Sequence, residues 1–362
     1  MDSKQFTLGI LSTLALFGIT TIDSSLLWQD KEDNLYTNNS LLASNTEERG
    51  PIELSAMEDE LFKERLENIS TDVSLEFNQT IKRSILAYLH NKKRTERVIG
   101  LCQVYKTLFD NVLAEYQMPQ IIANLPIIES ELNAHAQSPV GAMGLWQFME
   151  STGKLYDLNV NKHIDERKDP EKATIAAAQY LKHLHGRFGD WLLALAAYNC
   201  GPGRVSGAIK KAGGKKDYWE IRKYLPRETR NYVPKFIAAT YVNNYYFLHG
   251  LSPKIPELSI DFAYYISTHE AVTVDKFSKN NNVSAASIKR LNPFLLSELI
   301  PANTKLKMPF SQYEMNNMSL TPPSESTQIK LREEIDTFAK LAPIAPNFVE
   351  GGGLDLEIEG LN

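Results

Sequence analysis

Apolar residues recur at intervals of three and four along the middle of the chain, which is the pattern of amphipathic helices. Residues 98–116 show it first, in Leu101, Tyr105, Leu108, Val112 and Tyr116. An aromatic stripe at helical spacing usually packs in a core, so we expect Tyr105 and Tyr116 to be scaffold and not sugar-stacking residues.

Two more helices are predicted between residues 169 and 200. Asp169 supplies an N-cap, and the apolar face that follows continues to about Gly186. Residues 191–198 are almost wholly apolar, as expected of a helix that is buried on most sides. They lead directly into Asn199 and a Gly-Pro-Gly stop at residues 201–203. A polar motif is therefore attached to a helix of the core, which gives its side chains rigid support.

Beyond residue 260 the pattern changes to short alternating segments. Residues 263–266 and 305–308 favour strands, and residues 272–280 and 285–291 favour helices. The order strand, helix, helix, strand predicts a small α+β module over residues 261–310.

The two ends of the chain have different compositions from the middle. Residues 6–22 form an apolar run after Lys4, which is typical of an export signal. The run is shorter than the roughly 20 residues that span a bilayer comfortably, and no A-x-A site follows it. Residues 1–25 are therefore either a cleaved signal peptide or a membrane anchor. We expect residues 26–55 to be a polar linker and residues 311–362 to be a disordered tail.

Composition narrows the class of protein. With 362 residues, 43% of them hydrophobic, the chain can bury a sizeable core, and its length favours two or three domains. A net charge of −5, without a basic block carrying aromatics, argues against a nucleic-acid partner. Cys102 and Cys200 are too few for a disulfide-rich scaffold, and we interpret them as two separate buried thiols, although one bridge is possible. No Cys/His cluster has metal-ligand spacing, so we expect neither a metal nor a cofactor.

Glu129 is the main candidate for chemistry. It lies between the apolar residues Ile128 and Leu132, where partial burial would disfavour its charge and raise its pKa toward that of a general acid. Glu131, two residues later, would point well away from it on a helix. Asp165, Asp169 and Asp190 lie in positions typical of helix caps, which leaves one clear catalytic carboxylate.

A polar turn and a glycine-containing segment follow Glu129. Gly141 and Gly144 remove side-chain bulk and leave the backbone free to approach a ligand closely. We expect a helix to begin here and to present Gln147 and Met149 beside Glu129.

Three motifs in this order resemble those of the lytic transglycosylases with a goose-type lysozyme-like (SLT) domain. The first comprises E-S at residues 129–130, A-Q-S at 136–138 and G-A-M-G-L-W-Q-F-M at 141–149. The second is A-A-Y-N-C-G-P-G-R-V at 196–205, and the third is E-T-R-N-Y-V at 228–233. Within this family the chain is similar to the membrane-bound type D murein transglycosylases, which place helices before the catalytic domain and peptidoglycan-binding modules after it.

The resemblance implies a mainly α fold, with a lysozyme-like catalytic domain at residues 118–250 and a helical N-terminal region at residues 56–117. It also implies one glutamate that acts first as acid and then as base. The N-acetylmuramyl unit of peptidoglycan supplies the nucleophile, its C6 hydroxyl, and the product is a 1,6-anhydro end.

The same resemblance assigns roles to individual residues. The acid/base is Glu129; the glycan contacts are Ser138 and Gln147; the walls around the muramyl ring are Met149 and Tyr198; and the backbone support is Asn199. The third motif adds Glu228 and Tyr232 as substrate-binding residues. Two alternatives stay open, since Glu228 is also placed to cap a helix and Tyr232 to pack in the core.

The α+β module at residues 261–310 resembles a LysM module, a small glycan-binding unit tethered to the catalytic domain. The landmarks are Y-I at 265–266, L-N-P at 291–293 and L-K-M-P at 306–309. In place of the usual G-D-T-L the chain has H-E-A-V at residues 269–272, and this departure weighs against sugar binding.

Peptidoglycan is thus the expected partner, and the expected location is the bacterial periplasm or cell envelope. Membrane association depends on whether the N-terminal apolar segment is kept as an anchor or removed as a signal peptide. Two other functions compete with a lytic transglycosylase. A lysozyme-type muramidase would use a positioned water and leave a reducing end, and an inert scaffold would only bind glycan. An intact Glu129 argues against the inert scaffold.

Overall fold

The computed structural model describes residues 51–256 and 263–309, with side chains from Ala56 onward. Within these residues, three helices precede the sequence motifs: α3 (Pro51–Glu67), α4 (Gln79–His90) and α5 (Lys92–Glu115). Those that follow are α6 (Leu125–Ser130), α7 (Glu150–Leu155), α8 (Pro170–Phe188), α9 (Trp191–Cys200), α10 (Pro202–Lys211), α11 (Tyr218–Ile221) and α12 (Thr229–Tyr245). Short 3-10 turns are η2 (Gln120–Asn124), η3 (Glu166–Lys168), η4 (Arg222–Tyr224) and η5 (Tyr246–His249). The prediction of a mainly α fold is confirmed.

The three helices predicted by periodicity form as α5, α8 and α9. Helix α8 continues two residues past Gly186, because Gly189, with φ of 74°, supplies the left-handed C-cap. Helix α9 ends at Cys200, with Gly201 as its C-cap as expected, but Pro202 begins α10 at once. Proline suits the first turn of a helix, where no N–H partner is needed, so the predicted stop is a break between two helices.

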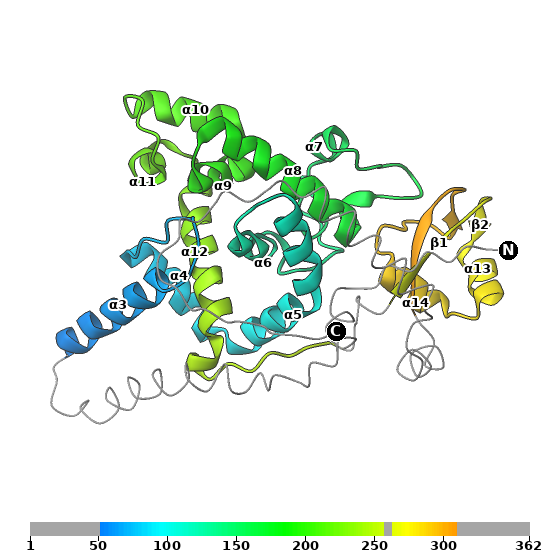
Figure 1. Cartoon of the computed structure of the whole chain (residues 1–362), viewed down its shortest axis with the longest axis horizontal. Coiled ribbons are helices and arrows are strands. Elements are labelled where there is room, and N and C mark those ends of the chain that lie inside the picture. Colours follow the sequence, from blue (N-terminus) through cyan, green and yellow to red (C-terminus); the bar gives the residue numbers. More distant parts are fainter. Residues whose placement is uncertain (1–50, 257–262, 310–362) are drawn as a thin grey trace, which may run out of the picture. The chain divides into compact units, whose positions relative to one another are not determined.

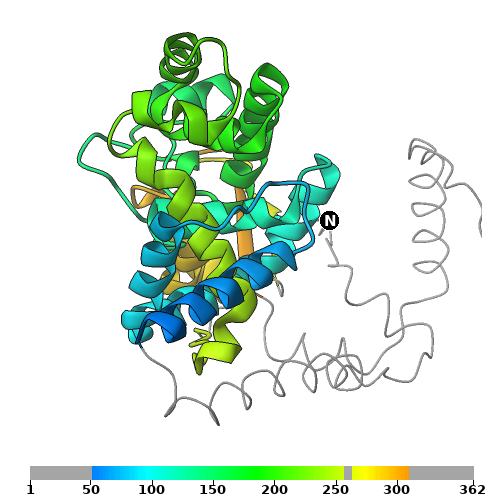
Figure 2. The ribbon, with the colours of Figure 1, turned by 90° about the vertical axis from the view of Figure 1, so that its left-hand side faces the viewer.

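Helix α12 passes α4, α6 and α9 and joins the N-terminal helices to the motifs (Figure 1). Figure 2 shows α3, in blue, crossing the yellow-green α12. Phe62 of α3 meets Tyr241 of α12 edge to face at 5.3 Å, and the Tyr245 hydroxyl donates to the Arg65 carbonyl at 2.8 Å. The helical region before the motifs is therefore packed into the same core as the motifs themselves.

One apolar cluster extends from α3 to Leu251 and fills the space between these helices. Tyr105 is buried in it and stacks on Phe109 at 5.6 Å, so the prediction that Tyr105 is scaffold is confirmed. Trp146 is fully buried, and its indole N–H donates to Thr174 of α8 at 2.9 Å. A buried tryptophan with its N–H satisfied anchors the segment that precedes α7.

Residues 263–309 form strands β1 (Ala263–Ser267), β2 (Val272–Thr273), β3 (Leu299–Ile300) and β4 (Lys305–Pro309) with helices α13 (Val274–Asn281) and α14 (Ala285–Leu291). β1 pairs antiparallel with β4, Ala263 opposite Pro309, and β2 pairs with β3. The predicted order of strand, helix, helix and strand is found, and only the short β2–β3 pair had no signal in the sequence. This module has a small apolar core of its own, which includes Phe277, Ile288 and Leu306.

This small core also includes Ile164 from the segment between α7 and α8. Two main-chain hydrogen bonds accompany it, from Asp165 N to Phe294 O at 2.9 Å and from Leu296 N to His163 O at 2.8 Å. The α+β module is therefore not held by a tether alone, because a neighbouring segment completes its core.

The predicted signal or anchor, most of the polar linker and the tail lie outside the described residues. No helix between residues 51 and 256 or 263 and 309 is long and apolar enough to cross a membrane. Both cysteines are free, with Cys200 buried and Cys102 partly so, which confirms two separate thiols.

Candidate active site

Glu129 occupies the last turn of α6, a helix that begins with a proline in its first turn and ends because Glu131 adopts a left-handed conformation with φ of 53°. The carboxyl group is partly buried, and burial is the main cause that raises its pKa, to about 7. The nearby negative charge of Glu228 raises the pKa further, while a hydrogen bond donated by the Tyr232 hydroxyl lowers it. Glu129 can therefore hold a proton near neutral pH, as a general acid must.

Glu131 has the opposite environment. It forms ion pairs with Arg94 and Arg97 of α5, and the hydrogen bond from Arg94 is the main cause that lowers the pKa of Glu131. Two carboxylates two residues apart are thus driven to different protonation states, a common arrangement where one of them performs acid catalysis.

The segment after Gly141 corrects one prediction, because no helix begins there. Gly141 and Gly144 have φ of 86° and 78°, and Gln147 is left-handed with φ of 49°. Such residues interrupt the helical hydrogen-bond series, and the chain forms a tight loop with bridges between Met143 and its neighbours Gln137 and Phe148. The helix begins only at Glu150.

Ser138 and Gln147 both stabilise this loop. The Ser138 hydroxyl accepts a hydrogen bond from Ala142 N at 2.9 Å. The Gln147 side-chain amide donates to the carbonyls of Gly144 at 2.9 Å and Ala136 at 3.3 Å. Their predicted role in glycan contact is not visible in these bonds, which instead hold the backbone of the loop in place.

The resemblance assigns Met149 and Tyr198 to the walls around the muramyl ring. Met149 is 42% exposed, which is unusual for a methionine and leaves it open to a ligand. The Tyr198 hydroxyl donates to Trp146 O at 2.7 Å and so ties α9 to the loop. Burial and then the charge of Glu129 raise the pKa of Tyr198, so the phenol and the carboxyl group are near neighbours.

The second and third motifs are joined directly. The Thr229 hydroxyl donates to Oδ1 of Asn199 at 2.8 Å, which connects α9 to the start of α12. Tyr232, one turn into α12, is buried and also bonds Glu129, so packing in the core does not exclude it from the site. Glu228 is exposed and forms no side-chain cap, and the capping alternative is therefore wrong.

The three aspartates have the structural roles predicted for them. Asp169 and Asp190 cap α8 and α9 through backbone N–H groups. Asp165 caps η3 and pairs with buried Arg167 at 2.7 Å. Arg167 in turn donates to Gly141 O at 2.9 Å and supports the glycine loop. Within the described residues no group of three or more His, Cys, Asp or Glu side chains is placed to hold a metal ion.

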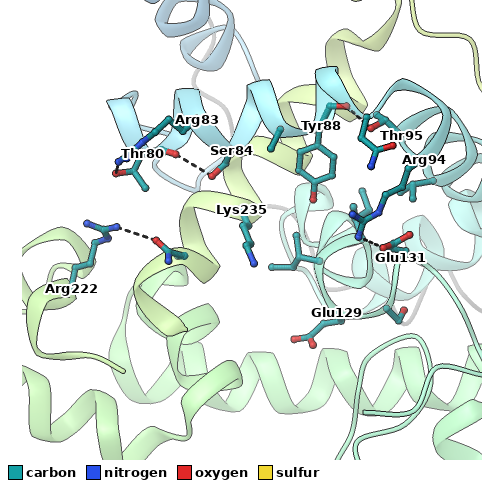
Figure 3. A pocket seen from close by; sticks show the side chains of 17 residues that line it. Thr80, Arg83, Ser84, Tyr88, Arg94, Thr95, Glu129, Glu131, Arg222 and Lys235 are labelled. Carbon is teal, nitrogen blue, oxygen red and sulfur yellow. Dashed lines mark hydrogen bonds and ion pairs between the residues drawn. The ribbon is translucent and has the colours of Figure 1, made fainter. Parts of the chain in front are cut away.

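A cavity of about 790 Å³ opens beside Glu129 between α4, α5, α6 and α12 (Figure 3). Of the eight predicted site residues, only Glu129 lines it. Its basic lining residues are Arg83, Arg94, Arg222 and Lys235. They come from separate segments outside the motifs, so neither periodicity nor spacing in the sequence pointed to them.

The family model of the transglycosylase SLT domain matches residues 108–221. The match covers the first two motifs and ends before the third. The chain is also 40% identical over 165 residues to the membrane-bound lytic murein transglycosylase D of Escherichia coli, covering 44% of this chain and 36% of that protein.

A soluble lytic murein transglycosylase of Escherichia coli is 32% identical over 141 residues, covering 37% of this chain and 22% of that protein. The crystal structure of the 70 kDa soluble lytic transglycosylase of the same organism aligns with a TM-score of 0.35 at 31% identity, over 40% of this chain and 24% of that one. The chain thus spans little more than a third of the length of the first of these relatives.

Proposed function

We propose that this chain, which carries a transglycosylase SLT domain at residues 108–221, is a lytic transglycosylase that cleaves peptidoglycan in the bacterial envelope. The observation that carries the proposal is the setting of Glu129, a carboxyl group with a pKa of about 7 that accepts a hydrogen bond from Tyr232. The similarity to two lytic murein transglycosylases supports the same substrate and reaction.

The proposed reaction breaks the β-1,4 bond between N-acetylmuramic acid and N-acetylglucosamine. Protonated Glu129 gives its proton to the leaving oxygen while positive charge develops at the sugar carbon. The resulting carboxylate then accepts the proton of the muramyl C6 hydroxyl, whose oxygen closes the 1,6-anhydro ring. Atoms balance without water, since the proton lost by Glu129 in the first step returns to it in the second.

The remaining predicted residues would hold the sugar in this scheme. Met149 and Tyr198 would wall the muramyl ring, Asn199 would fix the backbone, and the loop held by Ser138 and Gln147 would contact the glycan. We also propose that Glu228, exposed and close enough to raise the Glu129 pKa, helps to keep Glu129 protonated.

A lysozyme-type muramidase is the competing reaction, because the same acid could be followed by attack of water. Mass analysis of digested peptidoglycan separates the two. We expect muropeptides about one water lighter than lysozyme products, without new reducing ends. Mainly reducing muramyl ends would make the protein a hydrolase, and no cleavage would support a glycan-binding scaffold.

Envelope location and glycan binding by the module complete the proposal. The relative named membrane-bound supports action at the envelope. The N-terminal apolar segment would export the chain or anchor it, and the strand, helix, helix, strand order of residues 263–309 supports a LysM-like module. Separating full-length protein between membrane and soluble fractions distinguishes an anchor from a cleaved signal.

A further inference from the structure

The cavity beside Glu129 has an excess of positive charge. Two of its lining residues are acidic, Glu129 and Glu131, and Glu131 is already paired with Arg94. Arg83, Arg222 and Lys235 line the same cavity, and no carboxylate among the described residues forms an ion pair with any of the three. Like charges that face one space repel each other, so an anion entering the cavity would be favoured.

Lys235 is the basic residue best placed to act with the catalytic group. It lies three residues after Tyr232 on α12, and side chains at this spacing share one face of a helix. Tyr232 bonds Glu129, and Figure 3 shows Lys235 directed into the space between α4 and Glu129. Its ammonium group makes no hydrogen bond or ion pair to the described residues and is free to meet a ligand.

Arg222 is held at the edge of the cavity by a hydrogen bond to a carbonyl of α12 that Pro234 leaves without its usual helical donor. Pro234 has no N–H to donate to Arg230 O four residues earlier. Arg222 Nε donates to that carbonyl instead, at 2.7 Å, and its Nη2 donates to Asn231 at 3.4 Å. Two of five guanidinium N–H groups are thus used for orientation, and the rest remain for a ligand.

Arg83 is oriented in a similar way on α4. Its Nε donates to Gln79 O at 3.2 Å and its Nη2 to the Thr80 hydroxyl at 3.4 Å. A guanidinium fixed on one edge keeps its other donors available in a geometry that matches a carboxylate. Helix α4 lies before the region that the SLT family model matches, so this feature belongs to the N-terminal helices of this chain.

We propose that Arg83, Arg222 and Lys235 bind the carboxylates of the stem peptides that branch from the muramyl units of peptidoglycan. This inference rests on the proposed function. The N-acetyl groups and hydroxyls of the glycan backbone are neutral, whereas the attached peptides carry free carboxylates within reach of the cleaved bond. The basic cavity therefore selects peptide-bearing strands and places a peptide on the α4 side of Glu129.

Two substrates of equal length test this selection. One is soluble glycan strands with native stem peptides, and the other is the same strands after their carboxylates are converted to carboxamides. For the wild-type enzyme we expect the KM to rise about threefold on amidation, as for partly exposed ion pairs. Added salt should raise the KM of the native strands only, since screening weakens the attraction.

Lys235→Met is the principal variant, because Lys235 makes no bond that the fold needs. It should bring the two KM values close together with a melting temperature near that of wild type. Lys106→Met, which removes an exposed lysine of α5 outside the cavity, is the matched control and should keep the wild-type ratio.

An unchanged KM ratio in Lys235→Met and in the double variant Arg83→Gln/Arg222→Gln would overturn the inference, as would a wild-type enzyme indifferent to amidation. Failure of the proposed function gives a different result, namely no 1,6-anhydro product from either substrate. The two failures are therefore distinguishable in one set of digests.

Discussion

Glu129 and Glu131 show how strongly the environment of a single residue decides its chemistry. Glu129 is partly buried and accepts a hydrogen bond from Tyr232, whereas Glu131 forms ion pairs with two arginines. The first carboxyl group has a pKa of about 7, and the pKa of the second lies below its ordinary value. Only the first can deliver a proton at neutral pH.

Glu129→Gln should therefore keep the fold and glycan binding but lose nearly all turnover. Glutamine matches glutamate in size, yet it can neither give a proton to the leaving oxygen nor accept one from the C6 hydroxyl. The rate should fall by about 10² to 10⁴-fold or more. Glu131→Gln is the matched control and should do far less. If Glu129→Gln keeps more than about a tenth of the rate while Glu131→Gln does not, the acid is misassigned.

The pH profile gives a second test at this residue. Because Glu129 must be protonated to act as an acid, kcat/KM should fall as the pH rises through about 7. The Tyr232 hydrogen bond stabilises the carboxylate and lowers this pKa. Tyr232→Phe should therefore move the alkaline limb to higher pH, while Tyr105→Phe, in the core, should not. A shift toward lower pH would contradict this account of the pKa.

Stability should depend on the same titration. The pKa of Glu129 is raised on folding from 4.5 to about 7, so its contribution to stability is fully present below pH 4.5 and is lost as the pH rises through 7. Relative to wild type, Glu129→Gln should gain free energy of unfolding at pH 8 and change little at pH 4. Urea denaturation at both pH values measures this, and an equal difference at both would contradict it.

At the scale of elements, the loop at residues 141–148 depends on a close backbone contact. A Cβ atom at Gly144 would lie 1.9 Å from Arg167 O, and the φ of 78° is itself unfavourable for other residues. Gly144→Ala should therefore cost about 2–4 kcal/mol of unfolding free energy and lower the rate, because the loop must move.

Gly186→Ala is the control for this substitution. Gly186 lies inside α8 with nothing within 4 Å of its added Cβ, so alanine should stabilise the protein by about 0.5–1 kcal/mol. Thermal melts of both variants decide the matter. Equal destabilisation in the two would mean that the close contact with Arg167 is not what requires a glycine at residue 144.

At the scale of the whole molecule, the α+β module contacts the segment that supports the candidate active site. Ile164 packs into the small core of residues 263–309, and Asp165 next to it bonds both Phe294 and Arg167. Arg167 holds the carbonyl of Gly141. A continuous series of contacts thus leads from the module to the loop beside Glu129.

Deletion of residues 263–309 should therefore lower the melting temperature and also reduce cleavage of short soluble glycans. Exposing the Ile164 side chain to water alone should cost about 2 kcal/mol of unfolding free energy. Lys279→Ala, which breaks an exposed ion pair of the module, should change neither quantity. If the deleted protein cleaves soluble glycans at the wild-type rate and loses only retention on insoluble peptidoglycan, the module is a tether that raises local concentration.

The sequence by itself determined three helices of the core and the order of elements in the module, and it singled out Glu129 as the candidate acid. Periodicity located α5, α8 and α9, because a buried face repeats every three to four residues whatever it packs against. The motifs supplied the candidate site residues, in the order of the resemblance. The aspartate caps were also predictable, since a cap depends on residues two or three positions away.

Only the tertiary structure decided how these parts meet. The loop at Gly141 was predicted as a helix. That prediction failed because the loop conformation depends on Arg167, which is distant in sequence. The Tyr232 bond to Glu129 joins residues 103 positions apart, and the basic cavity gathers Arg83, Arg222 and Lys235 from three segments. Local patterns contain no information on such distances, whereas burial, charge and the pKa of a catalytic group depend on them directly.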